Sequence, residues 1–338
     1  MNHLFTPFKL KNLTLKNRIV LPPMCNFKPE TQNGIATEWH YIHYVSRAIG
    51  GTGLIIIEMS GVEADGRITK NCLGLWDDAQ IAPLKRIVDE CHKYGAKVAV
   101  QIAHAGRKAE HANDLVGPSA VVFDGEKTPR AFSTDEVKGM VGKFRDAVQR
   151  AVQAGVDSIQ LHGAHGYLIH QFHSPRTNKR EDAYGRDLTL FGCEVIAAAK
   201  EVMPANMPLM IRISATEYVE NGYRLEDGIK LAKAYQAAGV DLFDISTGGE
   251  IAMERSVLPT HAGYQVPHAR MIKEALTVPV ITVGRLSDPV FANAVIANND
   301  ADLVAVGRAA LRNPQWSFEA AHVLGERIEM PGQIGTGF

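Results

Sequence analysis

The stretch STDEVKGMVGKFRDAVQRAVQAGVDSIQLHGAH, residues 133–165, places a helix signal, a glycine and a strand signal in close succession. Ser133 can cap a helix, and Glu136 stands three residues later, as in a capping box. Apolar residues follow at helical spacing, namely Val137, Met140, Val141, Phe144, Val148 and Val152. Gly155 ends the helix, and VDSIQLHGAH continues as a strand. The stretch therefore predicts one helix-to-strand unit of an α/β fold.

The alternation of helix and strand recurs along the whole chain. Residues 225–246 repeat it with Gly239 between helix and strand, and residues 288–307 repeat it again. Most of the strand segments are rich in Val and Ile and lack polar alternation, which is typical of parallel strands buried on both faces. There are eight such segments: NRIVLPPM, GLIIIEMS, AKVAVQIAHAG, VDSIQLHGAH, MPLMIRISA, VDLFDISTG, VPVITVG and ADLVAVGR. We predict a single (β/α)8 TIM barrel that spans residues 1–338 as one domain.

Three segments fall outside the eight units. Residues 5–16 alternate in polarity and predict a hairpin that closes the bottom of the barrel. Residues 105–132 form a long excursion after the third strand, placed to cover the barrel mouth. The C-terminal MPGQIGTGF is rich in Gly and Pro and is expected to be an extended tail.

Charge and cysteine content narrow the class of protein. The formal net charge is -1, from 36 basic and 37 acidic side chains, which gives no case for a nucleic-acid or membrane-surface partner. No apolar run approaches the roughly 20 residues that span a bilayer, and the N-terminus lacks the pattern of a signal peptide. The four cysteines are scattered and are expected to be reduced thiols of a cytoplasmic protein, three of them packing residues.

Polar residues gather at the predicted C-terminal ends of the strands, where TIM barrels carry their active sites. They come from nearly every strand: Cys25, Met59, Gln101, His104, Arg107, Lys108, His162, His165, Tyr167, Arg212, Ser246 and Arg308. Packing alone does not require so many polar groups on one rim. We therefore expect this rim to be an active site.

The last two strand ends suggest a phosphate. Gly284 and Gly307 each stand between a buried strand and a helix, and Arg308 follows directly. Glycine allows the backbone to approach a phosphate closely, and loops after strands seven and eight often hold one. Each glycine alone would be expected to be only a turn residue, but the two together at these strands favour a phosphate-bearing cofactor. Gln101 and Arg212 suit a flat heterocycle with carbonyls and ring nitrogens, although Arg212 could instead pair with Glu58.

These segments together resemble the old yellow enzyme family of FMN-dependent ene reductases, in its thermophilic-like bacterial branch. The resemblance covers essentially the whole chain. The resemblance rests on five segments: LFTPFKLKNLTLKNRIVLPPMC, QIAHAGRK (101–108), HGAHGYLIHQFHSPRTNKREDAYG (162–185), IRISA (211–215) and VGRAALRNP (306–314). The block at 162–185 is the most specific of them.

The resemblance implies FMN as cofactor and NADPH or NADH as hydride donor. The implied FMN-binding residues are Pro22, Pro23, Met24, Cys25, Met59, Gln101, Arg212, Gly284, Gly307 and Arg308. Among them, the Cys25 thiol is implied to lie near the flavin and to tune its potential, which leaves a plain packing role as the alternative. The implied reaction is hydride transfer to the β-carbon of an α,β-unsaturated carbonyl compound.

The same resemblance implies roles for the turn after the fourth strand. His162 and His165 would donate hydrogen bonds to the substrate carbonyl, where negative charge develops. Tyr167 would protonate the α-carbon as general acid, and Phe27 and Lys108 would complete the substrate pocket. The alternative for the two histidines is half of a metal site completed by His104 or His173. No carboxylate or thiol is spaced to support a metal, so none is predicted.

The sequence departs from the branch in three places. Phe27 replaces the usual tyrosine, YGRDLTLF is a shortened motif, and Thr336 stands where an arginine that enters a partner subunit is expected. Substrate range and a shared-site dimer are therefore open, although a homo-oligomer is expected. Two other functions remain: an FMN barrel with a different oxidant or a sensing role, and a metal-dependent barrel lyase. His40 and His43 are expected on the outer face of the first helix.

Overall fold

Eight parallel strands form a closed barrel in the computed structural model, which describes residues 3–27, 32–125, 127–252 and 258–337. The barrel strands are β3 (Ile19–Leu21), β4 (Leu54–Gly61), β6 (Lys97–Ala103), β9 (Ser158–Gly163), β10 (Leu209–Ser214), β11 (Leu242–Ser246), β12 (Val280–Thr282) and β13 (Leu303–Ala305). Neighbours along the chain pair in parallel, and pairing of β13 with β3 and of β3 with β4 closes the ring. The predicted barrel and its eight strands are confirmed.

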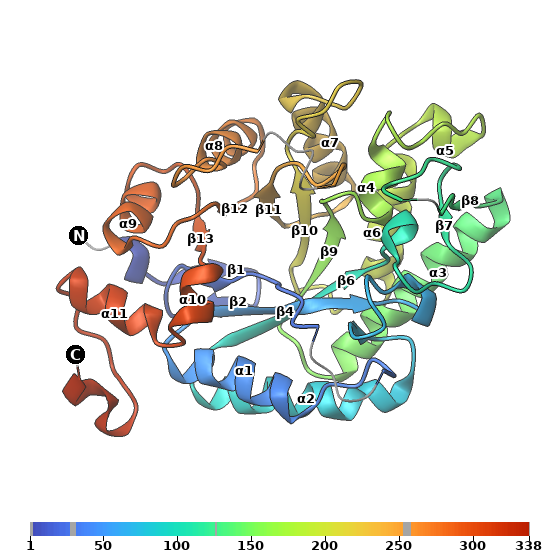
Figure 1. Cartoon of the computed structure of the whole chain (residues 1–338). Helices are drawn as coiled ribbons and strands as arrows, with labels where there is room; N and C mark the ends of the chain where they lie inside the picture. Colours follow the sequence, from blue (N-terminus) through green and yellow to red (C-terminus); the bar gives the residue numbers. More distant parts are fainter. Residues whose placement is uncertain (1–2, 28–31, 126, 253–257, 338) are drawn as a thin grey trace.

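Helices surround the barrel (Figure 1). The longer ones are α1 (Glu38–Ile49), α2 (Ile81–Lys93), α3 (Thr134–Gln153), α6 (Leu190–Val202), α7 (Leu225–Ala238), α8 (Val266–Ala275), α9 (Pro289–Ala297) and α11 (Trp316–Val323). The shorter ones are α4 (Leu168–His173), α5 (Ala183–Arg186) and α10 (Arg308–Arg312). In the described ranges, none of these helices is both long and apolar enough to cross a bilayer.

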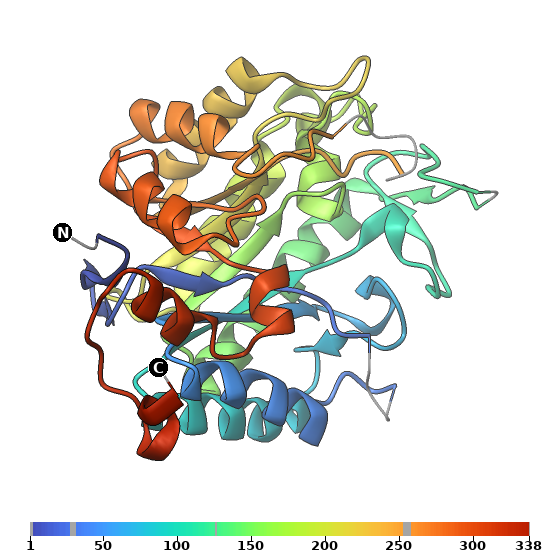
Figure 2. The ribbon, with the colours of Figure 1, turned by 60° about the vertical axis from the view of Figure 1, so that its left-hand side comes forward.

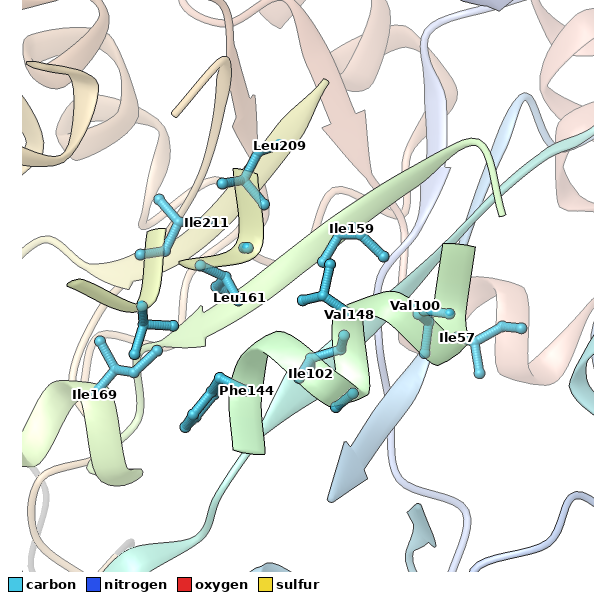
Figure 3. Close-up of a cluster of buried hydrophobic side chains, with 14 of the residues drawn as sticks. Ile57, Val100, Ile102, Phe144, Val148, Ile159, Leu161, Ile169, Leu209 and Ile211 are labelled. Atoms are coloured by element: carbon cyan, nitrogen blue, oxygen red, sulfur yellow. The ribbon is translucent and has the colours of Figure 1, made fainter. Parts of the chain in front are cut away.

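The capping box predicted for α3 is present. The Ser133 hydroxyl accepts the backbone N–H of Glu136 at 3.2 Å, and the Glu136 carboxylate accepts the N–H of Ser133 at 2.7 Å. The helix then buries Phe144 and Val148 against strands β6 and β9 (Figure 3). The main core of the protein lies in this layer between helices and strands.

A second apolar layer fills the inside of the barrel. The N-terminal hairpin of β1 (Phe8–Leu10) and β2 (Leu13–Leu15) supplies Phe8, Leu13 and Leu15 to it. These side chains pack with inward residues of the strands, such as Met210 and Leu303. The expected hairpin cap is therefore confirmed.

The excursion after β6 packs beside the turn that follows β9. It contains a short two-stranded pairing of β7 (Val116–Gly117) with β8 (Arg130–Ala131), and it projects from the barrel in the second view (Figure 2). Arg107 donates to the carbonyls of Val121 and Val122 within this excursion and to that of Glu250 after β11. Arg107 thus links the segment after β6 to the loop after β11.

Two expectations are wrong. Residues 332–337 do not form an extended tail but a 3-10 helix (Gly332–Gly337), a conformation built on i→i+3 backbone hydrogen bonds. His40 and His43 are buried rather than on an outer face. Helix α1 turns them toward the barrel, and Trp39 stacks on the His43 ring with centroids 5.0 Å apart.

Candidate functional site

A cavity of about 650 Å³ opens at the C-terminal ends of the strands. This volume is in the range of small-molecule and cofactor pockets. Residues predicted from the sequence line much of it: Pro22, Pro23, Met24, His165, Arg212, Gly284, Gly307 and Arg308. They follow or belong to β3, β9, β10, β12 and β13, so barrel closure brings them together.

One end of the cavity is built for an anion. Gly284 has φ +131°, and a side chain there would press on Gln265 at 3.3 Å. Three arginines, Arg285, Arg308 and Arg312, line this end. In the part of the chain that the structure describes, none of the three pairs with a carboxylate. Their charges are therefore available to a bound phosphate.

Two of these arginines were missed from the sequence. Arg312 lies four residues after Arg308 on α10, so a search for cations at helical spacing could have found it. Arg285 directly follows Gly284 and has φ +55°. The sequence contains no signal for this backbone conformation.

Arg212 belongs to a chain of polar groups across the barrel. It lies beside Asp244, with Nε 3.3 Å from Oδ2, and not beside Glu58 as one alternative held. Gln160 donates to the same Asp244 oxygen at 3.0 Å and accepts from Gln101 at 2.8 Å. Register explains the pairing, because Arg212 and Asp244 are direct neighbours across β10 and β11. The Arg212 Nε faces Asp244 without forming a hydrogen bond among the described residues, and the guanidinium lines the cavity, where its terminal N–H groups can serve a ligand.

The three residues given roles in the reaction meet in one cluster. The ring of His162 lies 5.3 Å from that of His165 and 4.8 Å from that of Tyr167, measured between centroids. Both histidine rings are oriented nearly edge-on to each other, at 86°. Of the three, His165 lines the cavity directly.

Burial sets the protonation of this cluster. It lowers the pKa of His162 and His165 well below the usual value, and the positive charge of Arg212 adds to this. Both rings are therefore neutral near pH 7. Because Nδ1 of His162 accepts the N–H of Ala164 at 3.3 Å, its Nε2 carries the proton and is a donor. Burial also raises the pKa of Tyr167, which keeps that hydroxyl protonated.

The turn that carries His165 is held from several sides. His165 has φ +60°, a conformation that non-glycine residues rarely adopt. The Ser214 hydroxyl accepts its N–H at 3.1 Å, and the Ser246 hydroxyl lies 2.7 Å from its Nε2. Lys108 donates to its carbonyl at 2.9 Å. These contacts fix the imidazole in place.

Lys108 was predicted to bind substrate, and in the structure it also links two loops by hydrogen bonds. Its ammonium group also donates to the Gly249 carbonyl at 3.2 Å and lies over the Tyr167 ring, 4.8 Å from the centroid. Burial lowers its pKa to about 8. Lys108 therefore ties the turn after β9 to the loop after β11.

A buried ionic network beneath this turn was missed from the sequence. His170 Nε2 lies 2.9 Å from Glu217 Oε1 and 3.6 Å from Glu250 Oε2, and Arg107 pairs with Glu250. His170 Nδ1 accepts the N–H of Gly166 at 3.1 Å. Among the described residues, His170, Glu217 and Glu250 are the one group spaced to hold a metal ion. The Arg107 guanidinium already neutralises Glu250, as a bound cation would. We therefore interpret the group as a structural ion-pair network and not as a metal site.

The histidines named as further metal ligands have other partners. His104 Nε2 lies 2.7 Å from Glu63, and His173 Nδ1 lies 3.0 Å from the Tyr235 hydroxyl. Neither joins His162 and His165.

The remaining predicted residues lie at the side of the cavity. Cys25 packs with the buried Met59, outside the cavity lining, and Phe27 is 45% exposed on the rim. Glu58, which was not predicted, accepts the backbone N–H of Asn26 at 3.0 Å and the Tyr44 hydroxyl at 2.9 Å. Burial raises the pKa of Glu58 to about 7.

The residues present fit FMN. Pro22, Pro23 and Met24 form an apolar wall, Arg212 offers an unpartnered donor, and the arginine end suits a phosphate. A flavin mononucleotide combines a flat ring with polar edges and a terminal phosphate, so each part has a matching surface.

Comparison with known proteins agrees with this geometry. A sequence model of the NADH:flavin oxidoreductase / NADH oxidase family matches residues 3–326. A protein of Listeria innocua named NADPH dehydrogenase is 46% identical over 342 residues, which cover 100% of both chains.

Solved structures show the same architecture. Morphinone reductase in complex with tetrahydroNAD superimposes with a TM-score of 0.81 and 28% identity, covering 97% of this chain and 92% of that one. A 2-naphthoyl-CoA reductase gives a TM-score of 0.89 at 24% identity, which shows a shared fold. The match covers 96% of this chain and 52% of that chain, so this chain spans about half its length.

Proposed function

The chain belongs to the NADH:flavin oxidoreductase / NADH oxidase family, which includes the old yellow enzymes, and from this premise we propose that it reduces activated C=C bonds with FMN and NAD(P)H. The enzyme is an oxidoreductase. Its proposed substrates are α,β-unsaturated carbonyl compounds. The single observation that carries the proposal is the neutral pair His162 and His165 with Tyr167 beside them at the cavity.

The protein supplies the binding surfaces. Pro22, Pro23, Met24, Cys25 and Met59 would border the flavin ring, with Gln101 and Arg212 toward its polar edges. Gly284, Gly307 and Arg308, together with Arg285 and Arg312, would hold the phosphate. Bound FMN would supply the hydride chemistry, from NAD(P)H to the β-carbon of the alkene.

The histidines would act on the substrate oxygen. His162 and His165 donate hydrogen bonds to the carbonyl, whose oxygen becomes more negative as the double bond is reduced, and each donor contributes about 2–4 kcal/mol. Tyr167 donates its phenolic proton to the α-carbon. Phe27 and Lys108 would border the substrate, with Phe27 offering no hydroxyl.

Relatives support the choice of hydride donor. The Listeria innocua protein is named NADPH dehydrogenase, and morphinone reductase was solved with tetrahydroNAD. We propose NADPH or NADH for this chain, with residues 1–338 acting as one FMN-binding domain and assembling as a homo-oligomer. Light scattering on the purified protein tests the last point.

An anaerobic absorbance titration tests the function. NADPH is added first and 2-cyclohexen-1-one second. A flavin band that bleaches with NADPH and returns with the enone is the expected result. A band that bleaches and does not return would indicate a different oxidant or a sensing role. A protein that cannot be loaded with FMN would overturn the proposal and reopen the metal-dependent alternative.

A further inference from the structure

Two of the four cysteines meet at the side of the cofactor cavity. Cys25 follows β3, and Cys72 directly precedes β5 (Leu73–Gly74). With Met59, Ala103 and Ile68 they form a small apolar cluster that is separate from the main core. The two cysteines are far apart in the sequence and come together because β3 and β5 both pair with the same strand, β4.

Met59 lies beside both cysteines. Cys25 packs against the apolar cluster that contains Met59 and Cys72. The pairing of Leu73 with Ser60 across β4 and β5 places Cys72, one residue earlier, beside Met59 in the same ladder. Cys25 packs against the cluster that contains Cys72, and each thiol shifts the pKa of the other. Two thiols packed in one cluster beside the same residue are a built pair and not two isolated thiols.

The two thiols differ in their ionisation. The hydrogen bond from Cys25 lowers the pKa of Cys72 to about 7, and the N–H of Thr69, 3.5 Å from Cys72 Sγ, acts in the same direction. The pKa of Cys25 is raised, because its hydrogen bond to Cys72, burial and the nearby Glu58 all disfavour its thiolate. The pair therefore contains one reactive thiolate near neutral pH together with one protonated partner.

We propose that Cys25 and Cys72 are a reversible oxidation site, converted by hydroperoxides into a disulfide bond beside the cofactor cavity. One sulfur, as its thiolate, attacks the O–O bond and becomes a sulfenic acid, while the alcohol (or water, from hydrogen peroxide) leaves with a proton. The second sulfur then displaces the hydroxyl group as water and forms the S–S bond. In sum, two thiols and one hydroperoxide give one disulfide, one alcohol and one water; the sulfurs lose two electrons and the peroxide gains them.

The other two cysteines provide internal controls. Cys91 is buried without a thiol neighbour, and burial raises its pKa to about 12. Cys193 is half-buried on α6, and burial raises its pKa as well. Neither is expected to react under conditions that oxidise the pair.

Thiol counting on the FMN-loaded protein tests the proposal. The reduced protein is treated with hydrogen peroxide near pH 7, the peroxide is removed, and free thiols are counted after denaturation, with peptide mapping by mass spectrometry. The expected result is loss of two of the four thiols, recovery of a linked Cys25–Cys72 peptide pair, and return of both thiols with dithiothreitol. This readout does not depend on turnover, so it can fail or succeed independently of the proposed reaction.

Variants sharpen the test. Cys72→Ser should abolish the linked peptide, whereas Cys193→Ser should still lose two thiols and yield it. Four thiols remaining in the treated wild-type protein would overturn the proposal. So would oxidation of Cys25 and Cys72 to separate sulfinic acids with no linked peptide, since that outcome means that the sulfurs cannot reach each other.

Discussion

At the scale of single residues, burial decides what the site histidines can do. His162 and His165 lie in a water-poor cluster beside Arg212, which makes their charged forms unfavourable. A neutral imidazole donates one hydrogen bond without adding a full charge. Such donors stabilise an oxygen on which charge develops, and they do not attract anions to the site beforehand.

Removing one of these donors should slow the oxidation of reduced flavin by an enone. For His162→Ala or His165→Ala, we expect the rate with 2-cyclohexen-1-one to fall about 100- to 1,000-fold, the range seen when one oxyanion donor is lost. Stopped-flow absorbance of the pre-reduced enzyme measures it. His111→Ala is the control, because His111 is exposed and outside the cluster. Unchanged rates in both site variants would contradict the assigned role.

The buried histidines of helix α1 make a prediction about stability. Burial lowers the pKa of His43 to about 3, against about 6.5 in an unfolded chain. Below pH 6.5 the unfolded chain therefore binds a proton that the folded chain does not, and protonation favours unfolding. The contribution of His43 to the free energy of unfolding should fall by about 1.4 kcal/mol for each pH unit below 6.5.

Comparison of His43→Gln with the wild type isolates that contribution. We expect the difference between their unfolding free energies to be constant above pH 7 and to change by about 1.4 kcal/mol between pH 6 and pH 5. Glu58 acts in the opposite direction, because its raised pKa makes the folded chain bind a proton between about pH 7 and pH 4.5. It is common to both proteins and cancels. Parallel pH dependences would show that His43 is not buried as described.

At the scale of elements, the turn between β9 and α4 is stabilised by the network below it. Gln171 donates to the carbonyls of Gly166 at 2.7 Å and Ala105 at 3.0 Å, and His170 accepts the N–H of Gly166. Gly166 has φ +70°, and a side chain there would lie 2.6 Å from the Gly249 carbonyl. The reactive turn is thus fastened to the segment that follows β6 and packs closely against the loop that follows β11.

Arg107 should be important for stability because it neutralises Glu250 in the interior. Arg107→Ala leaves a buried carboxylate without its cation, and we expect a loss of about 3–5 kcal/mol in the free energy of unfolding. Urea denaturation measures it. Arg145→Ala is the matched control, because Arg145 forms a surface pair with Asp146, and such pairs contribute about 0–1 kcal/mol. Equal losses in the two variants would contradict the network.

At the scale of the whole molecule, barrel closure assembles the anion end of the cavity. Arg285 follows β12, while Arg308 and Arg312 follow β13, and the Pro22–Met24 wall reaches them only because β13 pairs with β3. Each of these segments alone is a short loop or helix with one or two exposed cations. Together they form one surface with a net positive charge.

This assembly predicts discrimination between FMN and riboflavin, which differ by the phosphate. In Arg308→Ala/Arg312→Ala, the Kd for FMN should rise about 10- to 100-fold per lost charge-assisted contact, at about 1.5–3 kcal/mol each. The Kd for riboflavin should stay within about twofold, which is within ordinary variation for distant changes. Fluorescence titration of the flavin-free protein measures both. Equal weakening of the two ligands would place the phosphate elsewhere.

The sequence by itself determined the barrel and the residues on its rim. Runs such as GLIIIEMS are buried wherever they lie, and the Ser133 cap and Gly155 stop act within a few residues, so these features need no knowledge of distant contacts. The site residues could be predicted from the strand ends because a TIM barrel carries its active site at the C-terminal ends of its strands. That is why His162, His165, Tyr167, Gly307 and Arg308 could be named in advance.

Only the tertiary structure decided which of these residues meet and what they do there. Arg212 faces Asp244 because of strand register, and Cys25 packs in the cluster of Cys72 because β3 and β5 both pair with β4. His43 is buried because α1 turns it toward the barrel. Each contact joins segments far apart in the chain. Local periodicity indicates which residues share one face of an element, but it does not say which face meets the barrel or which residue is the partner, because both are set by strand register and barrel closure.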